Sequence, residues 1–517
     1  MCQVDEDYNG LLESPVVVSE TQKCNKCKET TAALILKPGE ALCRGCFKEH
    51  FVHKFRAMLG KNRIIFPGEK VLLAVSGGSS SCAMLSQVQE GLGQNAHKKL
   101  RFKPGIVYID EGCLLGQSME ERQKTMAQIH SLFKVTGFPY HIIPLEMVLN
   151  LPSSVLESVH LATDDPAGNY KVAVDHFMQS NPGHSVDPNT QVHQAELRVL
   201  TDATVPQLID ESQTQTLQEL FSRVKTLTAK EDLLHTLRRH LLVSTARAEG
   251  YSKLMLGENC TRLAVKLLAN IAMGRGAQLG VDTAFCDPRY GDIVAVKPMR
   301  DYTAKEISLY NYMWNVPSVF IPSLETKTAD KSSIQRLTES FVVKLQVDFP
   351  STVSTIYRTG EKLQTANFTE DIEGAPLKCL LCMCALDTTL GETSAFQATL
   401  ISEQLSNVGT THPMQGHLRP DTQTKCCSPC DQQDGEEQCE AHAVCCSHFK
   451  GGDSMNLESL LCYSCQQTVK DMTSVEFLPQ YIMSEAKRRN RRSQIRREIS
   501  EFLLNEDQDC TSIKAES

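Results

Sequence analysis

The sequence predicts an α/β fold built on a parallel sheet, with a small cysteine-paired module at each end. From residue 70 onward, short apolar runs alternate with amphipathic stretches, a pattern typical of parallel strands joined by crossover helices. Closely spaced cysteine pairs stand near both ends of the chain. The expected strands are VLLAV (71–75), GIVYID (105–110), YHIIPL (140–145), KLMLGE (253–258) and DIVAVKP (292–298).

Length and composition bound the class of protein. A chain of 517 residues is longer than the ~250–300 residues at which single cores stop growing, so two or three units are expected. Apolar residues make up 41% and charged residues 22%, as in soluble globular proteins. The acidic start, MCQVDEDYNG, lacks the apolar core of a secretory signal, and no apolar run approaches a membrane span. We therefore expect a cytoplasmic protein with no membrane partner.

Helical periodicity and polar stretches predict the organisation along the chain. Apolar residues at helical spacing indicate helices after residue 46 and at 233–251 and 261–276. The expected units are a disordered N-terminus (1–20), an N-terminal zinc module with its helix (21–60), a main α/β domain (61–370) with an insertion at about 150–225, a second zinc module (371–402 and 457–485), a disordered insert (403–456), and a basic helix with its tail (486–517).

The first cysteine module has the spacing of a zinc site. Twenty-one cysteines without an export signal are not expected to form disulfides, because cytosolic reductants keep thiols reduced. A C-x2-C-x15-C-x2-C pattern lets two knuckles close a tetrahedral Zn2+ site. Four thiolates leave no open coordination position, so this Zn2+ is expected to be structural. The ligands are Cys24, Cys27, Cys43 and Cys46.

A second set of cysteine pairs is split by the long polar insert. Loop-closure entropy grows only logarithmically with length, so the insert adds little to the cost of closing a second Zn2+ site. Cys384 and the cysteines of the insert are possible competitors, although "CCSPC" in a polar tract favours an adventitious cluster. The expected ligands are Cys379, Cys382, Cys462 and Cys465.

A serine- and glycine-rich turn, SGGSSS (76–81), follows the first expected strand and opens an amphipathic helix. Free backbone N–H groups at a helix N-terminus attract anions, and small residues let a phosphate approach them. The turn is neither a Walker loop nor a GxGxxG fingerprint. A serine-capped strand-to-helix turn with no ligand is the alternative.

SGGSSS resembles the SGGxDS loop of the PP-loop ATP pyrophosphatase superfamily, whose members adenylate a substrate. YIDEG (108–112), the segment 256–276 and the segment 296–312 resemble that superfamily's other conserved segments. With cysteine pairs at both ends, the chain is most similar to one branch, the eukaryotic cytosolic tRNA 2-thiolation proteins, and there to the second subunit. The resemblance implies a nucleotide loop made of Ser76, Gly77, Gly78, Ser79, Ser80, Ser81, Asp110, Gly257 and Asn259.

The chain departs from the superfamily pattern where acids are expected. Ser80 stands in place of the loop aspartate, Thr261 and Arg262 stand where two acids are usual, and Glu258 replaces a histidine. Losing acids removes groups that could hold Mg2+, which stabilises charge in such transfers. We expect this chain's own adenylation activity to be degraded, with ATP and Mg2+ bound by a partner subunit.

The resemblance also implies a function. The chain would form a heterodimer with cytosolic thiouridylase subunit 1 and take sulfur from a thiocarboxylated ubiquitin-related modifier. The complex would 2-thiolate the wobble uridine of cytosolic tRNA(Lys), tRNA(Glu) and tRNA(Gln) in 5-methoxycarbonylmethyl-2-thiouridine synthesis. Two alternatives stay open: the chain is itself an ATP-dependent tRNA adenylating sulfurtransferase, or it is a purely structural zinc-binding adaptor.

Sulfur transfer needs an exposed cysteine with a lowered pKa. Cys113 follows the second expected strand and Cys260 begins a later helix, so both belong at the sheet edge where ligands bind. They are the candidate catalytic residues. The alternative for both, and for Cys82, is a small buried apolar residue.

A basic segment near the C-terminus, SEAKRRNRRSQIRREISEFLL (484–504), predicts a helix with one apolar and one cationic face. A cationic helix face can follow a phosphate backbone, and the family resemblance favours tRNA. The alternative is a merely solvated face. The candidate tRNA-binding residues are Lys487, Arg488, Arg489, Arg491, Arg492, Arg496 and Arg497.

Overall fold

The computed structural model places most of the chain. It describes residues 22–36, 39–94, 96, 99–157, a few residues between 170 and 177, 210–326, 328–329, 331–363, 378–386 and 457–499. The expected disordered segments, 1–20 and 403–456, lie outside the described residues.

A six-stranded sheet forms the centre of the molecule, with strand order β5-β4-β3-β6-β8-β7. All neighbouring strands are parallel except β7, which runs antiparallel to β8 at the edge. The five expected strands are confirmed, whereas the two-residue β7 was missed because it carries no periodicity. The strands are β3 (Lys70–Ala74), β4 (Lys103–Asp110), β5 (Tyr140–Pro144), β6 (Lys253–Leu256), β7 (Cys286–Asp287) and β8 (Val294–Val296).

The sheet is buried on both faces, which explains its continuous apolar strands. Successive side chains point to opposite faces, so Val71 and Leu73 join one core and Leu72 joins the other. A mixed α/β fold with a parallel sheet is therefore confirmed.

The core on the first face is closed by four helices and by a hairpin near the N-terminus. Phe47, Phe51, Phe55 and Met58 form the buried stripe of α1, as the helical spacing predicts. The ring of Phe51 stacks on Tyr310 with centroids 4.0 Å apart, which joins α1 to α9. The elements are β1 (Leu34–Ile35), β2 (Ala41–Leu42), α1 (Arg44–Asn62), α2 (Ser79–Leu92), α3 (Met119–Lys134) and α9 (Ala304–Met313).

The core on the second face contains the C-terminal cysteine segment as well as α6. Leu380 and Ile482 pack in the same buried cluster as Leu237 and Leu254. The expected C-terminal cysteine module therefore shares a buried cluster with the main α/β domain. The elements here are α5 (Glu211–Ser222), α6 (Leu227–Ala248), η5 (Glu458–Leu460), α13 (Tyr463–Lys470), η6 (Val475–Phe477) and α14 (Gln480–Ile499).

A third, smaller core lies between α7, α10 and α11, around Leu263 and Tyr357. The expected helices at 233–251 and 261–276 correspond to α6 and α7. The remaining elements are η1 (Gly112–Leu115), η2 (Leu145–Asn150), η3 (Ser153–Leu156), α7 (Cys260–Ala272), η4 (Gly276–Gln278), α8 (Leu279–Thr283), α10 (Ile334–Asp348) and α11 (Thr352–Gly360).

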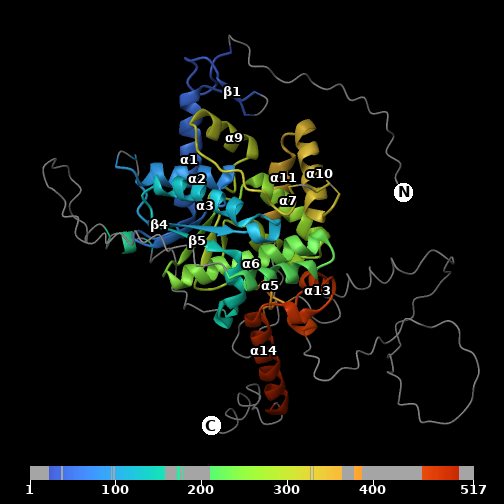
Figure 1. The fold of residues 1–517 in the computed structure, drawn as a ribbon. Helices are drawn as coiled ribbons and strands as arrows, with labels where there is room; N and C mark the ends of the chain where they lie inside the picture. The colour runs from blue at the N-terminus through green and yellow to red at the C-terminus, as the bar shows by residue number, and fades with distance from the viewer. Residues whose placement is uncertain are drawn as a thin grey trace, which may run out of the picture.

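The N-terminal hairpin with α1 and the C-terminal helix α14 lie at opposite ends of the molecule (Figure 1). Of the insertion expected at 150–225, the structure describes its beginning and α5, while most of 158–209 lies outside the described residues. Among the described helices, none has the length and apolar character needed to cross a membrane.

Candidate functional site

The strand order reverses at the centre of the sheet, between β3 and β6. Chain-consecutive strands β3, β4 and β5 run to one side, and β6, β8 and β7 lie on the other. Ligands of open α/β sheets bind outside the carboxyl ends of the strands at such a switch point. The glycine loop (76–81) follows β3, and the segment GENC (257–260) follows β6, so both lie at this switch point.

The two segments are in direct contact. A Cβ added to Gly257 would stand 2.8 Å from the Cα atom of Ser81, so only glycine allows this approach. Asn259 caps α7 by accepting from the Arg262 N–H at 2.9 Å, and its Nδ2 donates to Ser80 Oγ at 2.7 Å. The structure therefore brings the predicted residues of these two segments together.

Gly77 is the loop position that requires glycine, since its φ of +79° would be strained for any residue with a side chain. A Cβ there would lie 3.0–3.1 Å from the side chains of Ile321 and Ile129. The Gly77 carbonyl accepts from the Val319 N–H at 2.9 Å. The helix α2 begins after Gly78 without a side-chain cap, which leaves its first N–H groups to other acceptors.

The acids at this edge have other partners. Asp110 accepts from the Gly112 N–H at 3.0 Å with one oxygen and from Arg122 Nε at 2.8 Å with the other. Arg122 also donates to both oxygens of Glu146, at 2.7 and 3.2 Å. Glu111 pairs with Arg238. Asp110 is 3% exposed and belongs to a buried ion-pair network, in which each of its oxygens already accepts a hydrogen bond.

Two residues at positions where the sequence resemblance implies an acid and a histidine, Thr261 and Glu258, have structural roles here. The Thr261 hydroxyl accepts from the Ala304 N–H at 3.2 Å at the start of α9. Glu258 lies 3.4 Å from Lys266 Nζ and 3.7 Å from Lys297 Nζ. Although burial opposes ionisation, these lysines and Arg239 lower the pKa of Glu258 to about 2. Glu258 is therefore an ionised carboxylate that pairs with these lysines.

The candidate catalytic cysteines are packing residues in this geometry. Cys113 in η1 and Cys260 at the start of α7 are each 2% exposed. Burial raises the pKa of Cys113 far above its ordinary value, and burial raises the pKa of Cys260, like that of Cys82, to about 12. A nucleophilic thiolate needs the opposite environment. The geometry therefore favours the alternative of small buried apolar residues.

The N-terminal cysteines converge as the spacing predicts. The sulfurs of Cys24, Cys27, Cys43 and Cys46 all lie within 4.8 Å of one another. Cys43 is the N-cap of α1, and its sulfur accepts from the Cys46 N–H at 3.4 Å. Only Cys24 is buried. This set can hold a metal ion near the surface.

The C-terminal cysteines converge in the same way, although 80 residues separate Cys382 from Cys462, whose sulfurs lie 3.7 Å apart. Arg275 donates to Cys465 Sγ at 3.8 Å, and Arg289 donates to Cys384 Sγ at 3.0 Å. His240 of α6 lies 2.8 Å from the Leu381 carbonyl. This second candidate metal centre is therefore built into the core.

The basic segment is helical, but its arginines differ in role. Arg489 donates to Glu485 at 2.7 Å and to the carbonyls of Lys378 and Leu156, so it anchors α14 to the body. Arg488 pairs with Glu485 and Glu157 while remaining half exposed.

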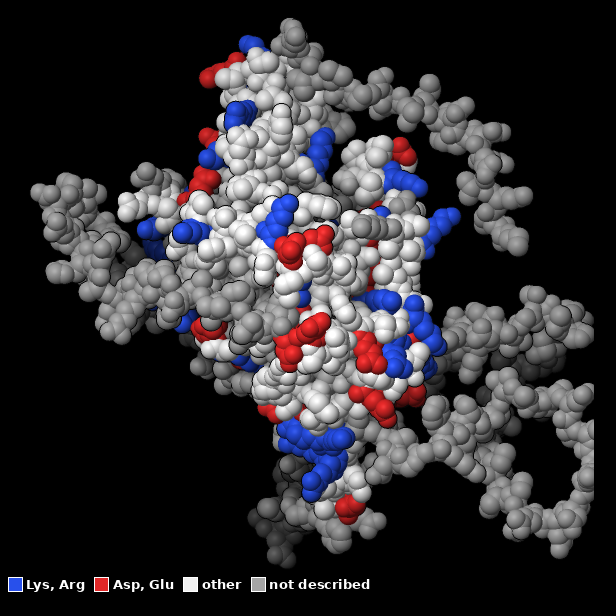
Figure 2. Space-filling model, in the orientation of Figure 1, with Lys and Arg blue, Asp and Glu red and all other residues white. Residues whose placement is uncertain are grey.

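The outward-facing cations of α14 gather at the lower end of the molecule (Figure 2). Lys487, Arg491 and Arg492 are exposed. Arg496 is partly buried, and the side chain of Arg497 lies outside the described residues, as do Phe502 and Leu503 of the expected apolar face. Ile495 and Ile499 are about half exposed. The cationic surface is thus smaller than the seven predicted residues.

Comparison with known proteins decides the family. The model of the family described as cytoplasmic tRNA 2-thiolation protein 2 matches residues 333–467. The chain is 54% identical to the cytoplasmic tRNA 2-thiolation protein 2 of Danio rerio, over 98% of this chain and 100% of that protein. It is 45% identical to the protein of that name from Homo sapiens, over 98% of this chain and 99% of the other. The chain belongs to the cytoplasmic tRNA 2-thiolation protein 2 family.

Among solved structures, the chain is similar to the U34-tRNA thiolase NcsA from Methanococcus maripaludis with its 4Fe-4S cluster. The TM-score is 0.45 at 15% identity, over 71% of this chain and 93% of that chain.

The matched segment of the tRNA 2-thiolation protein 2 family contains α10, α11 and all four C-terminal cysteines. Nothing in the sequence indicated two arginines that contact the candidate site residues. Arg122 donates a hydrogen bond to Asp110 at the sheet edge, and Arg275 donates to Cys465 in the C-terminal cluster. Each acts through a contact between segments distant in sequence or on different elements. Cys384, two residues after Cys382, was the one sequence signal of a further cysteine beside the C-terminal cluster.

Proposed function

We propose that this chain is a supporting, tRNA-binding subunit in cytoplasmic tRNA 2-thiolation, in which a partner subunit carries out adenylation. Full-length relatives named for this process support the pathway. The exposed cations of α14 support contact with the phosphate backbone. As the family resemblance implies, the partner is cytosolic thiouridylase subunit 1, the sulfur carrier is a ubiquitin-related modifier, and the target is the wobble uridine of cytosolic tRNA(Lys), tRNA(Glu) and tRNA(Gln).

The observation that carries this assignment is the state of the glycine loop. Ser80 makes a hydrogen bond with Asn259 where an acid would be needed to hold Mg2+. Asp110, the one acid of the predicted nucleotide-loop residues, accepts hydrogen bonds on both oxygens, from Gly112 and Arg122. The loop keeps a helix N-terminus suited to an anion, but its side chains lack the means to stabilise phosphoryl charge through a metal.

We further propose that both cysteine clusters hold structural Zn2+. Four sulfurs at about 2.3 Å from Zn2+ in a tetrahedron lie about 3.8 Å apart. The distances of 3.9 Å for Cys27–Cys43 and 3.7 Å for Cys382–Cys462 fit that geometry. When bound, Zn2+ supplies a closed cross-link that is not redox-active. The chain's own contribution is to hold the four sulfurs in place with the turns before α1 and α13.

The test of the supporting role compares loop variants in a reconstituted complex. Ser80→Ala removes the hydroxyl but keeps the backbone N–H groups, so 2-thiouridine per tRNA should stay close to the wild-type yield. Gly77→Val, at the crowded position with positive φ, should instead impair folding or assembly. Breaking the corresponding loop of the partner should abolish thiolation. Loss of thiolation by Ser80→Ala, with assembly and tRNA binding intact, would show that this loop is catalytic.

The test of tRNA binding uses charge reversal on α14. Arg491→Glu with Arg492→Glu should weaken tRNA binding and flatten its salt dependence by roughly 0.7–0.9 in log–log slope for each phosphate that the variant no longer neutralises. Arg489 is the wrong residue for this test, because it anchors α14 through Glu485 and through the carbonyls of Lys378 and Leu156, so its removal would disturb the helix as well as its charge. If the slope of log affinity against log salt concentration does not change, the cations of α14 are only solvated and do not contact tRNA.

A further inference from the structure

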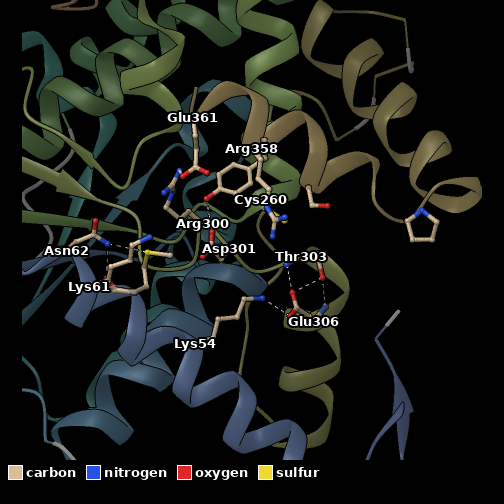
Figure 3. Close-up of a pocket in the computed structure, with 14 residues that line it drawn as sticks. Lys54, Lys61, Asn62, Cys260, Arg300, Asp301, Thr303, Glu306, Arg358 and Glu361 are labelled. Atoms are coloured by element: carbon tan, nitrogen blue, oxygen red, sulfur yellow. Dashed lines mark hydrogen bonds and ion pairs between the residues drawn. The ribbon is translucent and has the colours of Figure 1, made fainter. Parts of the chain in front are cut away.

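A cavity of about 280 Å3 lies away from α14, between the C-terminal half of α1, the turn leading into α9, and α11. Figure 3 shows Lys61 from α1 and Arg358 from α11 on opposite sides of it, with Arg300 between them. Tyr357 also lines the cavity. Cys260 also lines the cavity, so it adjoins the start of α7. Its volume is at the lower end of ligand pockets and suits a small polar group.

The acids that line the cavity are all engaged. Glu306 accepts from Lys54 Nζ at 2.8 Å and from the Thr303 N–H at 2.7 Å. Asp301 accepts from the Tyr357 hydroxyl at 2.6 Å. Glu361 pairs with Arg300 at 2.6 Å. The charges of Glu306 and Glu361 are therefore compensated by cations of the wall, whereas Asp301 is stabilised by a hydrogen bond from the neutral Tyr357 hydroxyl.

The cations are not all compensated. Lys61 and Arg358 are exposed, and no acceptor for either is found among the described residues. Arg300 is 7% exposed and donates to the Thr283 carbonyl and to Glu361, but its buried Nε has no acceptor within the part of the chain that the structure describes. The charged groups of the wall that lack partners there are thus all hydrogen-bond donors.

We propose that this cavity binds a phosphate group, held by Lys61 and Arg358 at its mouth and by Arg300 inside. Guanidinium and ammonium donors converging on a confined volume match the tetrahedral oxygens of phosphate. The phosphate belongs either to the tRNA backbone or to a small phosphate compound. A phosphate of the tRNA backbone is a source that rests on the proposed function, and it would give tRNA a second contact away from α14.

The first arm of the test measures tRNA binding by the full-length chain carrying Lys61→Ala and Arg358→Ala. Both side chains are exposed, so stability should change little. For a backbone phosphate, affinity should fall about two- to fivefold, and the log–log salt slope should decrease by roughly 0.7–0.9. Lys362→Ala is the matched control, because Lys362 is an exposed lysine beside Glu361 that does not line the cavity.

The second arm uses inorganic phosphate as the probe, with sodium chloride at equal ionic strength as the blank. For a cavity that takes a small phosphate, the wild-type chain should broaden the phosphorus resonance and gain thermal stability. The double variant should do neither, while Lys362→Ala behaves as wild type. In that case tRNA binding should not distinguish the three proteins.

A double variant that matches wild type in both arms overturns the proposal. The charge reversal of Arg491 and Arg492 separates this failure from failure of the proposed function. If the charge reversal weakens tRNA binding while the cavity variants do not, the proposed tRNA-binding role is supported, and the cavity does not hold a phosphate of the tRNA backbone. If the chain binds no tRNA at all, the phosphate arm still judges the cavity.

Discussion

The two cysteine clusters share a ligand set but differ in what surrounds them. The N-terminal cluster has one buried cysteine; it lies at the margin of the first core, and Thr30 and Lys26 of its own hairpin region are polar neighbours. In the C-terminal cluster three of the four cysteines are buried, and Arg275 and Arg289 donate to Cys465 and to the adjacent Cys384. Two clusters with the same pairing of cysteines can therefore have different roles: one closes a hairpin at the periphery, and the other joins segments of the main core.

The difference follows from what each cluster joins. The N-terminal ligands come from one stretch of 23 residues, Cys24 to Cys46, that leads into α1. The C-terminal ligands bring together two segments that pack against α6 on the second face of the sheet. Metal binding is coupled to folding in such sites, so loss of each metal should unfold what its cluster joins.

The largest effect is expected at the C-terminal cluster. Cys465→Ser should cost on the order of 4 kcal/mol or more, because Cys465 is 1% exposed and its cluster closes the main core. Urea unfolding and metal analysis would test this, with one Zn2+ per chain remaining. Cys384→Ser is the control and should retain both metals; a loss of metal there would make Cys384 a ligand.

A smaller effect is expected at the N-terminal cluster. Cys24→Ser should also remove one Zn2+ but cost only about 1–3 kcal/mol, since α1 stays anchored through Phe51 and Phe55. Hydrogen exchange should quicken in residues 22–46 and not in the sheet. If exchange quickens throughout the molecule, the two clusters do not differ as argued.

The attachment of α1 gives a pH-dependent test of the same contrast. Although burial opposes ionisation, His50 and Lys54 lower the pKa of Glu306 to about 2, from an ordinary 4.5. This stabilisation is present above pH 4.5 and is lost as the pH falls toward 2. Glu306→Gln should cost about 1–2 kcal/mol at pH 7.

The measurement compares the two proteins by denaturant unfolding between pH 7 and pH 3. Their difference in stability should shrink as the pH falls. A difference that stays constant would mean that Glu306 does not attach α1 through its charge.

The smallest effect concerns the arginine donors. Arg275→Lys keeps a cation beside Asp232 but loses the planar donor that reaches Cys465. Metal affinity of the C-terminal cluster should fall about tenfold, as for other residues that orient metal ligands. Competition with a chelator should then release this metal earlier and leave the N-terminal metal unchanged. Equal release from both clusters would mean that the arginine has no such role.

The parts of the fold that follow from local pattern were predictable. Apolar runs located β3, β4, β5, β6 and β8, and cysteine spacing located both clusters. The grouping of Gly257 and Asn259 with the glycine loop came from the family resemblance, whereas the strand order that brings them together is seen only in the structure.

What the sequence could not reveal depends on contacts between distant segments. The basic run does not distinguish Arg489, which turns inward to Glu485, from the exposed Arg491. Nor does the strand ending in Asp110 indicate that Arg122, on the next helix, forms an ion pair with that carboxylate. The burial of Cys113 and Cys260 likewise depends on residues that pack over them from other elements.

One consequence of the C-terminal cluster concerns protein engineering. Residues 378–386 and 457–499 lie in one core but are joined in sequence by a segment that supplies none of the four clustered sulfurs. A chain cut within 387–456 should therefore reassemble from two pieces, with Cys379 and Cys382 on one and Cys462 and Cys465 on the other. Zn2+ would then control association, and a chelator would separate the halves.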